Sequence, residues 1–170
     1  MRRLVTALVM LTSLALAATA QTQSISGKWK LSLTKSSLAS DHPRSDYQLT
    51  WAVTQTGNTV QITASATHVS MMNIPLPDSL TTTTYTADGK ERDVELPGIL
   101  PFLPKVPTSL RAEWQGTTLA INERSSTQSS ASSSTRRIYL SPDGAELIEL
   151  VESHSGYGDG EQRLVFEREH

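Results

Sequence analysis

The chain of 170 residues contains no cysteine. Disulfide bonds, thiolate metal ligands and a cysteine nucleophile are therefore excluded. Aromatic residues make up only 5% of the chain and charged residues 19%, with a formal net charge of −2. The charges are scattered and form no basic stripe of the kind that binds nucleic acid, so we expect no nucleic-acid partner.

Long apolar runs are almost absent, and the one that stands out, LVTALVMLTSLALA, occupies residues 4–17. It follows Arg2 and Arg3 and precedes the small residues of ATA, an arrangement typical of a signal peptide cleaved after Ala20. The run is too short to span a bilayer comfortably. We therefore expect a signal peptide at 1–20, one domain at 21–170 without a transmembrane segment, and a periplasmic or secreted product.

The rest of the chain alternates apolar and polar residues with a period of two, which predicts β-strands, and no segment shows a convincing helical period. In YQLTWAVTQ, for example, Tyr47, Leu49, Trp51 and Val53 share one face. About ten strands can be delimited in this way: 26–33, 47–55, 59–67, 80–87, 92–96, 109–115, 118–125, 134–140, 145–153 and 162–168.

The connections between these strands alternate between tight turns and long loops. Tight hairpin signals are found at TGN, ADGK, QGT and SPDG, residues 56–58, 87–90, 115–117 and 141–144. Long connections lie at 34–46, 68–79, 97–107, the serine-rich 125–135, which we expect to be a flexible loop with frayed strand ends, and 154–161. In an antiparallel meander this order puts the tight turns at one end and the long loops at the other. The fold class we predict is therefore all-β: a single up-and-down antiparallel meander, closed or nearly closed into a barrel.

The loop PGILPFLPKVP, residues 97–107, combines four prolines with large apolar side chains and is predicted to lie at the mouth beside MMNIPLP, residues 71–77. Exposed apolar patches of this size usually mark contact sites, whereas the alternative is a small core packed under the loops. The aromatic line of strand 47–55 has the same two interpretations, a ligand wall or ordinary barrel core. The candidate ligand-binding residues are Tyr47, Trp51, Met71, Met72, Ile74, Ile99, Leu100, Phe102, Leu103 and Trp114.

Catalytic and metal-binding signatures are missing. The four histidines, His42, His68, His154 and His170, have no partner at metal-ligand spacing. No nucleophile elbow or phosphate loop occurs, although a histidine–carboxylate pair could assemble from the histidines near the mouth. We expect no catalytic residue, no metal and no cofactor, and a binding function is favoured over an enzymatic one.

Several segments resemble lipocalin-like (calycin) barrels, and the ordered set GKWKLSLTKS, TADGKE, AEWQGTTLAI, YLSPDGAELIE and LVFERE resembles a largely uncharacterised group of small secreted bacterial proteins of this kind. The resemblance implies a lipocalin-like barrel with Gly27 and Trp29 near the start of the first strand. It also implies that Arg168, from the last strand, packs across Trp29 as a structural residue. The lipocalin Thr-Asp-Tyr motif is absent, and ten strands are nearer to the fatty-acid-binding barrels than to the lipocalin eight.

These observations predict a non-enzymatic binding protein for a small apolar or amphipathic molecule that enters between loops 69–79 and 97–107. The alternative is an envelope protein–protein interaction module with a filled core, in which the proline loops form a docking patch. We expect a monomer. The sequence does not identify the ligand.

Overall fold

The computed structural model describes residues 23–38, 47–68, 70–71, 74–75, 77–96, 105–126, 131–156 and 158–169. Twelve strands lie in these ranges: β1 Gly27–Leu31, β2 Gln48–Thr56, β3 Thr59–Thr67, β4 Ser70–Met71, β5 Ile74–Pro75, β6 Ser79–Thr86, β7 Asp88–Leu96, β8 Val106–Gln115, β9 Thr118–Ser126, β10 Ala131–Leu140, β11 Glu146–Ser155 and β12 Gly158–Arg168. No helix is found in the described part of the chain, and thus none there that could cross a membrane. The expected signal peptide, residues 1–20, lies outside the described residues.

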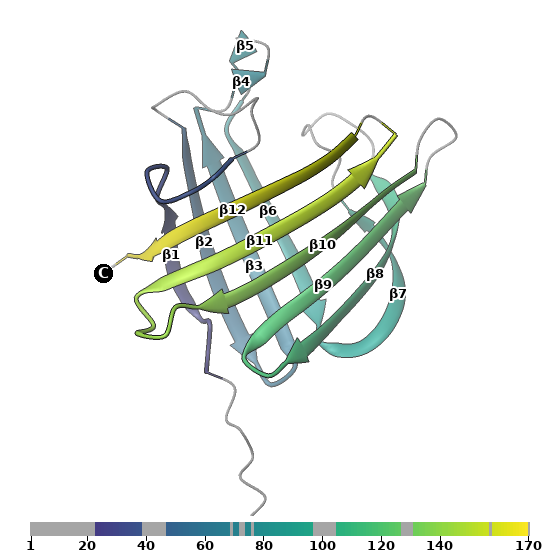
Figure 1. The fold of residues 1–170 in the computed structure, drawn as a ribbon, viewed down its shortest axis with the longest axis horizontal. Coiled ribbons are helices and arrows are strands. Elements are labelled where there is room, and N and C mark those ends of the chain that lie inside the picture. Colours follow the sequence, from purple (N-terminus) through teal and green to yellow (C-terminus); the bar gives the residue numbers. More distant parts are fainter. Residues whose placement is uncertain are drawn as a thin grey trace, which may run out of the picture.

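Ten of the strands form one antiparallel sheet in the order β6-β3-β2-β1-β12-β11-β10-β9-β8-β7, and β4 and β5 pair separately. Strands β1 and β12, from opposite ends of the chain, are neighbours in register, with Trp29 opposite Arg168. The sheet curls into a nearly closed barrel whose two edges are β6 and β7 (Figure 1). The predicted meander of ten strands is therefore confirmed.

The barrel is open between β6 and β7, where the sequence suggested a hairpin. Only Ala87 separates the two strands, residues 88–90 of the expected ADGK turn belong to β7, and β6 and β7 are sheet edges that do not pair with each other. Instead, the amide of Ala87 donates to the carbonyl oxygen of Asn58 at 2.7 Å, and Asp88 accepts from both terminal nitrogens of Arg92. A bulge follows between Asp88 and Glu91. The corner is thus held by the neighbouring β2–β3 turn and by contacts within β7.

Tight turns gather at one end of the barrel (Figure 1). The long connection expected at 154–161 is wrong, because β11 continues to Ser155 and β12 begins at Gly158 at the opposite end. The turns at Gly57, Gly116 and Gly144 have φ of 56°, 63° and 71°, values that glycine adopts at no steric cost. We call their end the closed end, and the opposite end the mouth. Residues 97–104 of the proline-rich loop lie outside the described residues. Pro107 lies inside β8, at a position where β8 pairs with β7 but not yet with β9, as suits a residue without an amide hydrogen.

The serine-rich segment is more ordered than its composition suggested. Strand β9 continues to Ser126 and β10 begins at Ala131, so most of the predicted flexible loop is strand. Serine hydroxyls are paired across these strands, since Ser125 and Ser132 are 2.7 Å apart. The low-complexity composition reflects a polar strand surface in this part of the chain.

The apolar core fills the closed end. The rings of Trp51 and Phe166 stack with centroids 4.3 Å apart, and Trp29 is completely buried. Burial of each such side chain stabilises the fold by about 1.5–3 kcal/mol. The largest completely or nearly completely buried side chains come from strands all around the barrel and from the segment before β1: Trp29, Phe166, Ile25, Leu119, Ile121, Ile138, Leu147, Glu149, Val60 and Val165.

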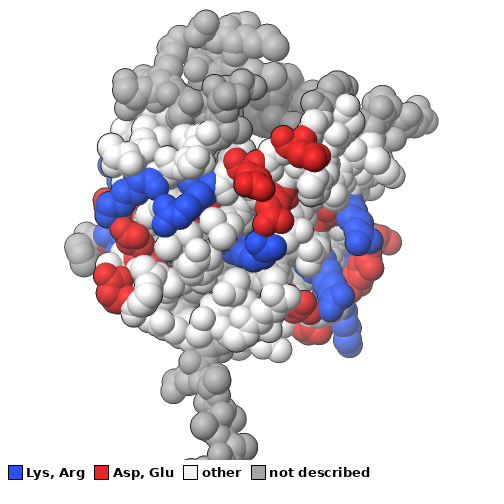
Figure 2. Space-filling model, in the orientation of Figure 1, with Lys and Arg blue, Asp and Glu red and all other residues white. Residues whose placement is uncertain are grey.

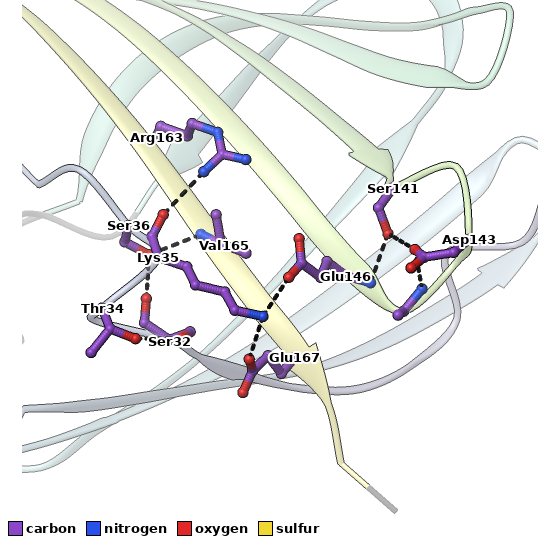
Figure 3. A network of polar contacts seen from close by, with 11 residues as sticks. Ser32, Thr34, Lys35, Ser36, Ser141, Asp143, Glu146, Arg163, Val165 and Glu167 are labelled. Carbon is purple, nitrogen blue, oxygen red and sulfur yellow. Dashed lines mark hydrogen bonds and ion pairs between the residues drawn. The ribbon is translucent and has the colours of Figure 1, made fainter.

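The segment that follows β1 is tied to the last two strands by polar contacts (Figure 3). Lys35 Nζ lies 2.6 Å from Glu146 Oε1 and 2.8 Å from Glu167 Oε1. The hydroxyl of Ser36 accepts from the amide of Val165 at 2.9 Å. These contacts strengthen the closure of the barrel next to the short pairing of β1 with β12.

On the face drawn in Figure 2, side chains of both signs are interspersed.

Candidate functional site

Inward-facing residues that are cross-strand partners in β9, β10, β11 and β12 lie side by side in rows across the sheet, and we call each row a level. Nearest the closed end, Leu140, Leu147 and Phe166 form an apolar level. The next level carries Glu149 among apolar neighbours, and the level after it carries Arg136 with Ile121, Val151 and Gln162. Above them, the level of Glu123 contains Ser134, Ser153 and Gly160, and the last described level contains Ser125, Ser132, Ser155 and Gly158. The interior wall formed by these strands therefore changes from large and apolar to small and polar toward the mouth.

A cluster of four side chains occupies the middle of the interior, and we call Tyr85, Glu123, Arg136 and Glu149 the interior cluster. Arg136 Nε donates to Glu149 Oε1 at 2.6 Å, and its Nη1 donates to the Tyr85 hydroxyl at 2.7 Å. The same Nη1 lies 3.5 Å from Glu123 Oε1, whose other carboxylate oxygen accepts from Ser134 at 3.1 Å. Because Tyr85 comes from the edge strand β6, the cluster reaches across the barrel.

Burial and neighbouring charges set the pKa values of Tyr85 and Arg136. Burial raises the pKa of the Tyr85 hydroxyl, and the Arg136 charge only partly opposes this effect. For Arg136, burial by itself lowers the pKa of the guanidinium, but Glu149, Tyr85 and Glu123 together outweigh burial and the pKa is raised well above its ordinary value. The guanidinium therefore remains a cation although it lies inside the barrel.

The opposite wall of the upper interior is smaller and more apolar. Ala64 and Ala66 face inward on β3, Leu49 is half-buried on β2, and Tyr47 is half-buried just before it. Leu96 and Val94 pack against the core from β7. Alanine and serine side chains are short and glycine has none, whereas large side chains fill the closed end.

Three of the predicted ligand-binding residues have side chains that the structure describes. Trp51 belongs to the packed core, whereas Tyr47 is half-buried nearer the mouth, and burial raises the pKa of its hydroxyl. Trp114 packs against the core, and its buried indole N–H meets no acceptor among the described residues. The structure does not bring these three rings into one wall. Met72, Ile99, Leu100, Phe102 and Leu103 lie outside the described residues, and for Met71 and Ile74 only the backbone in β4 and β5 is described.

Gly27, Trp29 and Arg168 meet at the closed end. The Arg168 guanidinium carbon lies 4.4 Å from the centroid of the Trp29 ring, and the indole N–H donates to the carbonyl oxygen of Ile25 at 3.0 Å. A Cβ on Gly27 would lie 3.0 Å from Arg168 Nη1, and the φ of Gly27 is 149°. Arg168 itself remains exposed, so one face of its guanidinium covers the buried indole and the other face contacts solvent.

A histidine–carboxylate pair is present, but it lies on the outside of the barrel. His154 Nδ1 and Asp159 Oδ1 are 2.8 Å apart, and their side chains are 63% and 76% exposed. Ser133 is the cross-strand partner of His154, but the hydrogen bonds among the described residues include none between these two side chains. Exposed pairs of this kind contribute little, and the arrangement has the character of a surface contact.

The interior cluster is the site that sequence reasoning missed. Arg136 and Arg137 are adjacent in STRRIYL. Because successive residues of a strand point to opposite faces, one of them must point inward and the other outward, and the pair of arginines does not by itself show which. Arg137 pairs on the outside with Glu152 at 2.7 Å. Ile138 and Leu140, which share a face with Arg136, carried the signal that this position points inward.

No protein-family model matches the chain, and no curated protein matches it. Solved structures do match in fold. Human cRBP IV is 12% identical with a TM-score of 0.53, over 86% of this chain and 99% of its own. The Schistosoma mansoni fatty acid binding protein in complex with arachidonic acid is 14% identical with a TM-score of 0.53, over 88% and 98%. A secretory abundant heat soluble protein from Ramazzottius varieornatus is 9% identical with a TM-score of 0.55, over 85% and 95%. At these identities the likeness shows a shared lipocalin-like barrel fold.

Proposed function

We propose that this protein binds a small amphipathic molecule inside the barrel, with the polar end of the molecule on the interior cluster and its apolar part toward the mouth. The single observation that carries the proposal is the cluster itself. It places an arginine, two carboxylates and a tyrosine hydroxyl between a packed core and a wall of small side chains.

The energetics of buried ion pairs support a role other than stability. The Glu149 side chain is 3% exposed and that of Arg136 19%. Removing such charges from water costs several kcal/mol per ion, and replacing a buried pair by packed apolar residues is often neutral or stabilising. Buried charges with named partners, set in the interior of a barrel, are therefore candidates for ligand recognition.

The upper interior supplies the apolar contacts that such a ligand needs. Leu49, Ala66, Val94 and Leu96 line the side opposite the serine wall. Removing about 200 Å² of ligand surface from water contributes about 5 kcal/mol before the costs of binding. Fold neighbours named for fatty acid and, at 16% identity, bile acid binding are compatible with this use of the barrel, but the named residues carry the argument.

Entry between loops 69–79 and 97–107 is part of the proposal. Both connections join strand ends at the mouth, β3 to β6 and β7 to β8, and their sequences are rich in proline and apolar residues. Export to the periplasm or the medium is proposed on the sequence of residues 1–20 alone.

Filling the upper interior tests the proposal. We expect the neutral fluorescent probe N-phenyl-1-naphthylamine to bind the wild-type protein, and Ala66→Trp to weaken that binding at least about tenfold by occupying the space above the cluster. Ala52→Trp, which places the same ring on the exposed face of the adjacent strand β2, is the matched control and should bind the probe as the wild type does. Equal probe affinity in both variants, or no uptake by the wild type, contradicts binding inside the barrel.

A further inference from the structure

We infer that the interior selects a cationic head group, such as the ammonium of an alkylamine, held by Glu123, and that it disfavours carboxylates. The inference rests on the proposed function and names its ligand class. Three observations support it: the charge balance of the interior, the order of the charges along the barrel, and the unequal partners of the two carboxylates.

The charge balance of the interior cluster is negative. Apart from Arg168, which covers Trp29 at the closed end, the inward-facing charged side chains that the described strands supply are Arg92, Glu123, Arg136 and Glu149. Arg92, on the edge strand β7, is already neutralised by both oxygens of Asp88, at 2.6 and 2.8 Å. The remaining three groups comprise one cation and two anions, so the cluster carries a net charge of −1 when these three are ionised and Tyr85 is neutral.

Glu123 is the more weakly paired of the two carboxylates. Glu149 is almost fully buried and holds Arg136 Nε at 2.6 Å. Glu123 lies at 3.5 Å from the same guanidinium, and its side chain is 19% exposed. A charge-assisted hydrogen bond normally has a length of about 2.7–2.9 Å, so Glu149 is the close counter-ion of Arg136 and Glu123 retains acceptor capacity.

Of the three charges in the interior cluster, Glu123 lies nearest the mouth; Arg92, which Asp88 already neutralises, lies on the same level. Along β9 the chain rises from the closed end through Leu119 and Ile121 to Glu123, one level above Arg136 and two above Glu149. A molecule that enters from the mouth therefore meets a carboxylate before it meets the arginine. The hydroxyl of Ser134 lies beside it and adds a neutral hydrogen-bonding group.

This order of charges separates head groups by sign. An ammonium gains an opposite charge at Glu123 and leaves the Arg136–Glu149 pair intact. A carboxylate meets a like charge and reaches Arg136 only by displacing or protonating Glu123, both of which cost free energy. An alcohol can hydrogen-bond to Glu123, but it is neither attracted as an opposite charge nor repelled as a like charge.

Three ligands of equal chain length test the inference: decylamine, decanol and decanoate, each below its critical micelle concentration at pH 7 and measured by displacement of N-phenyl-1-naphthylamine. At this pH the amine is charged and the acid ionised. We expect decylamine to bind at least about tenfold more tightly than decanoate, with decanol between them. Equal or tighter binding of decanoate overturns the inference.

Glu123→Gln removes the charge and keeps the shape. We expect the ratio of decylamine to decanoate affinity to fall about tenfold, each affinity being measured against the probe affinity of the same variant. Glu152→Gln is the matched control, because it removes the same charge from the outer face of β11 and should leave the ratio as in the wild type. An unchanged ratio in Glu123→Gln overturns the assignment of Glu123, as does an equal fall in both variants.

The same experiment separates this inference from the proposed function. If the neutral probe binds and is sensitive to Ala66→Trp, the barrel is a binding site whatever the head-group preference proves to be. If the probe does not bind the wild-type protein, both the binding function and the head-group class are overturned.

Discussion

Arg168 and Trp29 lie opposite each other where the first and last strands, β1 and β12, pair. The indole is fully buried and satisfies its N–H on Ile25, so the guanidinium is left to cover the ring face. Gly27 is needed beside them because a side chain there would meet the guanidinium. The Gly-x-Trp pattern is thus explained by close approach of an arginine from the last strand.

Arg168→Ala should lower the melting temperature and leave ligand affinity unchanged. A cation–π contact of this kind is worth about 0.5–2 kcal/mol, and it lies at the end of the barrel away from the mouth. Thermal unfolding by circular dichroism and probe titration measure the two effects. Arg124→Ala, which removes an exposed arginine on β9, should leave the melting temperature nearly unchanged; a similar fall in this control contradicts the role given to the closed end.

Gly27→Ala completes the test as a double-mutant cycle. Alone it should destabilise the fold, both through its backbone conformation and through the displaced guanidinium. In the Arg168→Ala background the second cost disappears, so the two changes should be less than additive. Strict additivity would show that the glycine and the arginine do not act on each other.

At the scale of elements, the turn between β10 and β11 contains an acid-sensitive contact. The Ser141 hydroxyl donates to Asp143 Oδ1 at 2.5 Å and the amide of Ala145 donates to the same oxygen at 3.1 Å. These bonds, the hydroxyl first, hold the pKa of Asp143 below its usual value. A carboxyl whose pKa is lower in the folded than in the unfolded state stabilises the fold above the unfolded-state pKa, and this stabilisation is lost as the pH falls through the folded-state pKa.

Asp143→Asn should therefore flatten the acid limb of the stability curve. We expect the free energy of unfolding, measured in urea between pH 7 and pH 2.5, to fall less steeply toward low pH in the variant than in the wild type. Asp93→Asn, on the exposed face of β7, is the control for loss of a carboxyl. An unchanged slope in Asp143→Asn would mean that the turn does not stabilise the ionised side chain.

The elements themselves were largely readable from the sequence. Alternation located the ten main strands, and glycine-containing turns gave their connections and the end at which each turn lies. The open seam was not readable, because ADGK has the residues of a hairpin turn and only the bond of Ala87 to Asn58 and the bulge after Asp88 show why β6 and β7 do not pair.

At the scale of the whole molecule, the interior cluster is the feature that the sequence alone did not predict. Arg136 is 13 residues from Glu149 and 51 from Tyr85, and the second contact crosses the barrel. Strand parity indicates which side chains point inward, but the levels that bring these charges together depend on the registers of four strands. The serine-rich segment 125–135 was likewise predicted to be a loop, because composition alone does not distinguish strand residues that line the interior from a flexible segment.

The open seam between β6 and β7 has a consequence for chain connectivity. Apart from the β4–β5 excursion, sheet neighbours are sequence neighbours except at the β1–β12 pairing, which joins residues such as Trp29 and Arg168. A circular permutant that begins at Asp88, joins Glu169 to Gln23 by a short glycine–serine linker and ends at Ala87 has its strands in the same order as the sheet. Its new ends fall at the seam, where no ladder is cut, and every pairing becomes local. Because folding rates rise as contacts become more local, this permutant should refold faster than the natural connectivity in stopped-flow experiments.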